Sequence, residues 1–155
     1  MSSSSEFLGK AISKTYTVTI PMKLPSCNTY IYECRKNRYA GAKMKAEVED
    51  EIGWYLRRKL PEIKKPVVIH FHWVEGNKKR DLDGICFAKK FILDAMVKQG
   101  IIADDNRKYV TAFYDSFEYG WTTKVIIEVM EVEDGEKIDR GNDHSGDQIR
   151  GRGNS

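Results

Sequence analysis

The chain has 155 residues, of which 41% are hydrophobic and 32% are charged, and its formal net charge is +3. This size suits a single folded domain, and the composition excludes a disordered or collagen-like chain. No apolar run is long enough to span a bilayer, and the Ser-rich start lacks the features of a secretory signal, so we expect no membrane partner.

The cysteines and the charge distribution narrow the class of protein further. Cys27, Cys34 and Cys86 have an odd count and no CxxC spacing, which predicts neither a disulfide framework nor a structural zinc site. We therefore expect a reducing, cytoplasmic location. Residues 1–131 carry 22 basic and 17 acidic side chains, and this modest positive excess permits a polyanionic partner such as DNA.

The first half of the domain predicts a strand, a helix and a second strand. Residues 15–20 are β-branched or aromatic and end at a proline, which is typical of a strand. Residues 25–28 have the composition of a turn, and residues 42–60 repeat apolar side chains at helical spacing until the next proline. The apolar and aromatic run 67–74 predicts the second strand.

The second half predicts one more helix and two strands. The helix covers residues 83–98, and strands follow at 108–114 and 121–130, with Gly120 placed to form a hairpin between them. The order β-α-β-α-β-β indicates an α/β (α+β) domain with a small mixed sheet and two helices over residues 15–131. We expect residues 1–14 to be a flexible segment and residues 132–155, rich in Gly, Asp and Arg, to be a disordered tail.

Charged residues are densest where the second strand meets the second helix. The segment contains three cations followed by two acids: Lys78, Lys79, Arg80, Asp81 and Asp83. Asp105 follows the helix, and the three acids converge if the helix folds back. Carboxylates hold Mg²⁺ or Mn²⁺ and neighbouring cations hold phosphates, so the pattern favours a phosphodiester site. Each acid taken singly is also explained as a helix cap or a turn residue.

Three other patterns have a functional and a structural interpretation. On the predicted helix, Lys90 and Asp94 share a face with Asp83, opposite an apolar face. A basic stretch that suits DNA backbone contact, or a solvated helix face, holds Arg35, Lys36, Arg38, Lys43 and Lys45. His70 and His72 share one face of a strand but need a third ligand to bind zinc. Trp54 and Trp73 are expected in the core.

These motifs together resemble the RusA family of Holliday junction resolvases, in its phage and prophage branch. The matching segments are Lys79-Arg80-Asp81-Leu82-Asp83, Lys90, Leu93-Asp94-Ala95-Met96, Gly100, Asp104-Asp105 and an upstream Pro25-Ser26-Cys27-Asn28. The similarity covers about residues 15–130, and the order of the linked acidic motifs is specific.

The resemblance implies a RusA-like fold and a Mg²⁺-dependent endodeoxyribonuclease in which Mn²⁺ substitutes for Mg²⁺. Such an enzyme is a homodimer that resolves four-way DNA junctions by symmetric paired nicks, in recombination, repair or phage DNA processing. It implies that Asp81, Asp83 and Asp105 are metal ligands and that Lys90, or alternatively Lys89, is the catalytic lysine. The location it implies is the cytoplasm of a bacterial host.

Two positions depart from the family pattern. Gly84 stands where the family usually has Asn, and Lys90 lies seven residues after Asp83 instead of about one helical turn. Two other functions remain open. One is a non-catalytic DNA-binding module of the same fold. The other is a metal-dependent enzyme that uses the same acidic site on a different substrate, either a nuclease for other branched DNA or a nucleotide phosphohydrolase.

Overall fold

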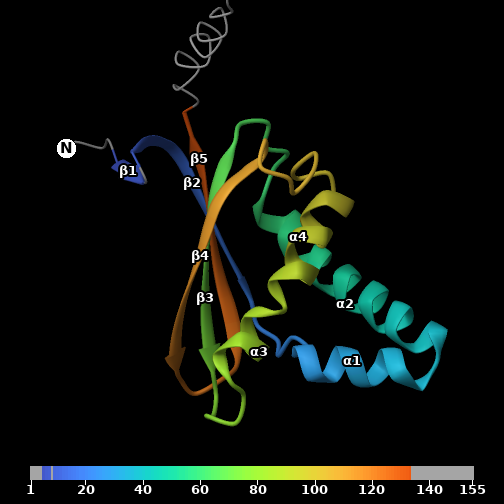
Figure 1. Cartoon of the computed structure of the whole chain (residues 1–155). Helices are drawn as coiled ribbons and strands as arrows, with labels where there is room; N and C mark the ends of the chain where they lie inside the picture. The colour runs from blue at the N-terminus through green and yellow to red at the C-terminus, as the bar shows by residue number, and fades with distance from the viewer. Residues whose placement is uncertain (1–4, 8, 134–155) are drawn as a thin grey trace, which may run out of the picture.

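The chain forms one sheet with its helices on one face, as the computed structural model of residues 5–7 and 9–133 shows (Figure 1). The elements are β1 Ser5–Phe7, β2 Lys10–Ile20, α1 Cys27–Lys36, α2 Arg38–Lys59, β3 Val67–Glu75, α3 Leu82–Cys86, α4 Lys89–Lys98, β4 Val110–Tyr119 and β5 Lys124–Val132. The predicted mixed α+β class is confirmed. No helix in these residues is long and apolar enough to cross a membrane.

The sheet has five strands in the order β1-β2-β5-β3-β4. β3 pairs in parallel with β4 and antiparallel with β5, so it lies between them. The predicted hairpin between the last two strands is therefore wrong. Gly120 does mark a chain reversal, but the connection passes the end of β3, where the Gly120 N–H donates to the Glu75 carbonyl at 2.9 Å.

The described residues form four helices where the sequence predicted two: the helix predicted at 42–60 is α2, and α1 precedes it. The predicted turn at 25–28 is instead the start of α1, whose N-cap Ser26 accepts a hydrogen bond from the Thr29 N–H. Asn37 then caps α2 by accepting from the N–H groups of Tyr39 and Ala40 at 2.9 Å. No residue of α1 is fully buried, and its Tyr30 packs against the core only in part, so apolar spacing is a weak signal for this helix. The helix predicted at 83–98 is divided into α3 and α4.

The sheet also extends beyond the predicted domain boundary. Residues 10–14, expected to be part of a flexible segment, lie in β2, and Ile12 pairs with Val132 of β5. Backbone pairing places these residues in the sheet although few of them are apolar. The remainder of the predicted tail, from residue 134 onward, lies outside the described residues.

The main core lies between the helix-bearing face of the sheet and α2 and α4. Its largest fully buried side chains include Ile20, Ile52, Leu56, Ile69, Phe71, Phe91, Ile92 and Met96. Trp73 is buried as expected, but Trp54 is 47% exposed on α2, where the guanidinium of Arg58 lies over its ring. No described helix covers the opposite face of the sheet, where a smaller apolar cluster surrounds Val68 and Met130 (Figure 1).

Candidate functional site

A buried ion pair holds the loop that carries the charged segment. The carboxylate of Glu75, at the end of β3, accepts two hydrogen bonds from Arg80, at 3.1 Å from Nε and 2.8 Å from Nη2. Arg80 Nη1 also donates to the Leu24 carbonyl at 2.8 Å. Bidentate, charge-assisted pairs are strongly directional, so this loop is fixed both to β3 and to the segment before α1. Arg80, expected to contact DNA, is instead used inside the protein, with 15% of its side chain exposed.

Next to this pair, an open pocket with an empty volume of about 610 Å³ lies between the starts of α1 and α3. Its lining residues are Ser26, Cys27, Asn28, Lys79, Arg80, Asp81, Asp83 and Gly84. Asp81 occupies the N-cap position of α3, but its side chain makes no capping hydrogen bond. Neither the Asp81 nor the Asp83 carboxylate has a hydrogen-bond or ion-pair partner among the described residues. The pocket therefore holds two carboxylates that are available to a cation.

Other groups that line this pocket attract anions. Lys79 contributes an ammonium group, and α1 begins there with Cys27 and Asn28 in its first turn. The first N–H groups of a helix have no partner within the helix, and the helix dipole adds partial positive charge at this end. A phosphate oxygen suits these groups, which line the same pocket as the two carboxylates. The arrangement is one that a phosphodiester and a divalent cation can occupy together.

Asp105 does not join this pocket within one chain. In the parallel pair, Val67 lies opposite Val110 and Glu75 opposite Tyr119, so the Asp81 loop follows one end of the strands and Asp105 precedes the other end. A strand of this length spans roughly 25–30 Å. Figure 1 shows the connection from α4 to β4 at the end of the sheet far from α3.

The predicted convergence of three aspartates in one chain is therefore wrong. A parallel connection has to return along the whole length of the first strand before the second begins, and α3 and α4 make that return. Within residues 5–7 and 9–133, no three His, Cys, Asp or Glu side chains are placed to hold a metal ion together.

The two candidate lysines have different surroundings. Lys89 is 14% exposed, forms an ion pair with Asp115 at 2.7 Å, and lies 4.2 Å from the ring centre of Phe113. Lys90 is 61% exposed, and its Nζ lies 3.5 Å from Asp94. Neither belongs to the pocket lining. Lys89 is thus engaged inside the protein, whereas Lys90 is free to reach a bound partner.

The basic stretch at the junction of α1 and α2 is largely accessible. Arg35, Arg38 and Lys43 are exposed, and Lys36 lies 3.1 Å from Glu33. Lys45 differs because its ammonium contacts the buried Glu49 and lies 3.0 Å from Asp94. Burial lowers the pKa of Lys45, but hydrogen bonds to Glu49 and Asp94 outweigh it and raise that pKa overall. Of these predicted DNA contacts, Lys45 is the one committed to packing α2 against α4.

The predicted site omits Glu75 and Asp115, two carboxylates that hold the predicted site residues Arg80 and Lys89 in place. Glu75 has a recognisable signal, because it is a charged residue that closes an otherwise apolar strand. Asp115 has no such signal, yet it accepts from Trp73 Nε1 at 2.8 Å and pairs with Lys89. Burial, and then the charge of Asp115, raises the pKa of the Cys86 thiol. Cys86 therefore stays protonated at neutral pH and is a poor nucleophile.

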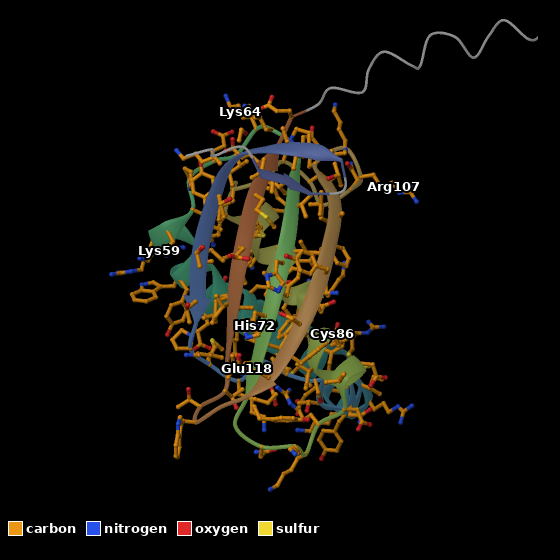
Figure 2. All side chains as sticks on the ribbon, turned by 90° about the vertical axis from the view of Figure 1, so that its left-hand side faces the viewer. Lys59, Lys64, His72, Cys86, Arg107 and Glu118 are labelled. Carbon is orange, nitrogen blue, oxygen red and sulfur yellow. The ribbon has the colours of Figure 1, made fainter. Side chains whose placement is uncertain are left out.

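His70 and His72 form part of a hydrogen-bonded chain on the helix-free face. His70 contacts Glu128 at 2.9 Å and Ser116 at 2.6 Å, while His72 contacts Ser116 at 2.6 Å and Glu118 at 2.7 Å. Figure 2 looks onto this face and shows His72 and Glu118 beside each other. All four ring nitrogens are engaged, so the zinc alternative has neither free imidazole nitrogens nor a third ligand among the described residues.

Comparison with known proteins leaves the family open. No family model matches the chain, and a search of the curated proteins finds no matching sequence. The pocket and its surroundings therefore carry the functional argument.

Proposed function

We propose that this chain is a Mg²⁺-dependent, structure-selective endodeoxyribonuclease that resolves four-way DNA junctions by symmetric paired nicks. The observation that carries the proposal is the pocket lined by the carboxylates of Asp81 and Asp83, which have no partner among the described residues, together with Lys79 and the start of α1. The RusA-like motifs support the same substrate. Such a protein acts in the cytoplasm of a bacterial host, in recombination, repair or phage DNA processing.

The donor set of the pocket fits Mg²⁺, with Mn²⁺ as a substitute, because both prefer carboxylate oxygens. Asp81 and Asp83 would hold the cation, which when bound activates water and neutralises charge on the attacked phosphate. Lys79 and the N–H groups at the start of α1 bind phosphate oxygens and keep the phosphodiester beside the carboxylates. Lys90, exposed on α4, contributes a further positive charge for the scissile strand.

A homodimer gives Asp105 a role in this site. Two symmetric nicks require two active sites related by a two-fold axis. A dimer whose β3–β4 pairs run in opposite directions would bring the pocket of one chain and Asp105 of the partner subunit to the same end of the assembly, because the two features occupy opposite ends of each chain. Each complete site then combines Asp81 and Asp83 from one chain with Asp105 of the partner subunit.

The proposed activity is tested with a labelled four-way junction and a linear duplex of equal length, in Mg²⁺ or EDTA. We expect paired nicks in the junction only, lost in EDTA. Asp83→Asn should lower the cutting rate roughly a hundredfold or more while junction binding persists, since several kcal/mol of charge stabilisation is removed. Asp50→Asn is the matched control, because Asp50 is an exposed acid on α2, outside the pocket.

Two results would contradict this proposed function, and each would indicate a different one. Junction binding without cutting in Mg²⁺ or Mn²⁺ would indicate a non-catalytic DNA-binding module. Equal cutting of flaps or forks would indicate a nuclease for other branched DNA.

Mixed dimers test the shared site directly. Asp83→Asn and Asp105→Asn chains are each expected to be inactive alone. Co-refolded together, they should regain single nicks, because one of the two sites in the mixed dimer then keeps all three aspartates. If each chain held a complete site by itself, both sites of the mixed dimer would stay defective and no activity would return.

A further inference from the structure

The connection between β4 and β5 carries a tryptophan that nothing covers. Trp121 is 100% exposed, whereas Trp73 is 3% exposed. Among the described residues it has no ring contact and no side-chain hydrogen bond. A tryptophan offers a large apolar surface, whose exposure to water is unfavourable. Single exposed aromatics are common on protein surfaces, so the surroundings of Trp121 decide what it can do.

The backbone beneath Trp121 is firmly held. The Gly120 N–H donates to the Glu75 carbonyl at 2.9 Å, and Thr123 Oγ1 accepts from the Gly76 N–H at 3.0 Å. Gly120 also approaches β3 so closely that a Cβ there would lie 2.8 Å from Val74 Cγ1. Both ends of this connection are thus bonded to the end of β3. The indole is therefore presented on a short, anchored tip, which reduces the entropy lost on binding.

Cations and a second exposed aromatic lie beside this tip. Tyr119 is 53% exposed, and Lys78 Nζ lies 5.0 Å from the centre of its ring. Lys79 follows on the loop bonded to the tip through Gly76, and Lys124 begins β5. Aromatic faces interleaved with ammonium groups are the surface that stacks on nucleobases while binding the phosphate backbone.

Glu75 is bonded both to the tip and to a residue that lines the carboxylate pocket. The backbone carbonyl of Glu75 holds Gly120, while its side chain holds Arg80, the residue before Asp81. Both features therefore lie at the same end of the sheet.

We propose that Trp121 is a stacking site for an unpaired nucleobase at the branch point of the DNA, with Tyr119 and Lys78 beside it. This inference rests on the proposed function and adds to it the element that recognises the branch. A branch point supplies such a base more readily than a continuous duplex, because strands exchange there and interrupt the continuous stack, which lowers the cost of unstacking a base. The contact reads branch geometry without reading sequence, since every base has a π-face.

The test uses the Asp83→Asn background, which keeps the DNA intact, and four-way junctions with 2-aminopurine at the branch or within an arm. Trp121→Ala should weaken junction binding roughly ten- to a hundredfold, the loss of about one base–aromatic stack. The slope of log K against log salt should not change, because stacking releases no counterions. Trp121→Phe should retain most of the affinity, and Trp54→Ala, which truncates an exposed tryptophan on α2, should bind like the parent.

The fluorescence signal and a charge variant complete the test. Binding should change the branch 2-aminopurine signal in the parent but not in Trp121→Ala, and the arm probe should stay unchanged in both. Lys78→Ala should instead reduce the magnitude of the slope of log K against log salt by about one, because one phosphate contact is lost.

Unchanged affinity and unchanged branch fluorescence in Trp121→Ala would overturn the stacking site, while junction cutting by the wild-type chain would leave the proposed function standing. An equal loss on linear duplex and junction would also overturn it, because the contact would not depend on a branch. If the wild-type chain binds no DNA, the proposed function and this inference fail together.

Discussion

Arg80 donates two hydrogen bonds to the carboxylate of Glu75, and this pair connects three parts of the molecule. It closes β3, fixes the loop that leads to Asp81, and through the third hydrogen bond of Arg80 reaches the Leu24 carbonyl before α1. Glu75 is 5% exposed, so its charge depends on Arg80 for compensation. The shape of the pocket therefore depends on a pair that makes no contribution to the proposed chemistry.

Removal of Glu75 should destabilise the whole domain. Glu75→Ala leaves the guanidinium of Arg80 largely buried without its partner, and breaking such a pair lowers the free energy of unfolding by about 3–5 kcal/mol. Urea denaturation at pH 7 measures the change. Glu118→Ala is the control, because that carboxylate is 56% exposed and its loss should change the free energy by less than about 1 kcal/mol. Equal urea midpoints for Glu75→Ala and wild type would contradict a structural role for the pair.

The adjacent lysines on α4 should separate stability from activity. Lys89→Ala leaves Asp115 without its 2.7 Å ion-pair partner in a largely buried position, so the free energy of unfolding should fall by about 1–3 kcal/mol. Lys90→Ala should change it by less than about 0.5 kcal/mol, since that side chain is mostly exposed, but should slow single-turnover junction cutting. If Lys89→Ala instead slowed junction cutting without lowering the free energy of unfolding, and Lys90→Ala did not slow it, Lys89 would be the catalytic lysine.

Gly84→Asn should be accommodated without strain. A Cβ at this position would lie 4.0 Å from the Ser26 Cβ, an ordinary contact, and a non-glycine residue favours the helical conformation of α3 slightly. We expect an unchanged or slightly higher free energy of unfolding and half-maximal cutting at a lower Mg²⁺ concentration. Gly84→Ala separates the two effects, because it fills the same space without an amide. If the wild type, Gly84→Asn and Gly84→Ala reach half-maximal cutting at the same Mg²⁺ concentration, the amide has no role in holding the cation.

Lys45 should make stability dependent on alkaline pH. Its folded-state pKa is raised above the ordinary value of 10.5, because the hydrogen bonds to Glu49 and Asp94 outweigh burial. Its contribution is therefore fully present below about pH 10.5 and is lost as the pH rises through the higher folded-state pKa. Lys45→Met should lower the free energy of unfolding by about 1–3 kcal/mol at pH 7, and the difference from wild type should shrink above that range. A difference that stays constant from pH 7 to pH 11 would attribute the loss to packing alone.

Local sequence patterns predict which faces of the main elements are buried. Apolar spacing located β3 and most of α2, and on the crossover helices it separated the buried Ile85, Ile92 and Met96 from Lys90 and Asp94 on the other side. It also placed Asp81 and Asp83 at the junction of a strand and a helix. These features depend on neighbours within a few residues, where the periods of helix and strand dictate which side chains share a face.

The tertiary structure establishes which distant segments meet. It inserted β3 between β4 and β5, paired Arg80 with Glu75, and brought the start of α1 to Asp83. It also carried Asp105 to the far end of the sheet, because a parallel crossover has to return the full length of β3 before β4 begins. Local periodicity reports that a face is buried but not what covers it, and the choice of covering partner depends on packing across the whole sheet.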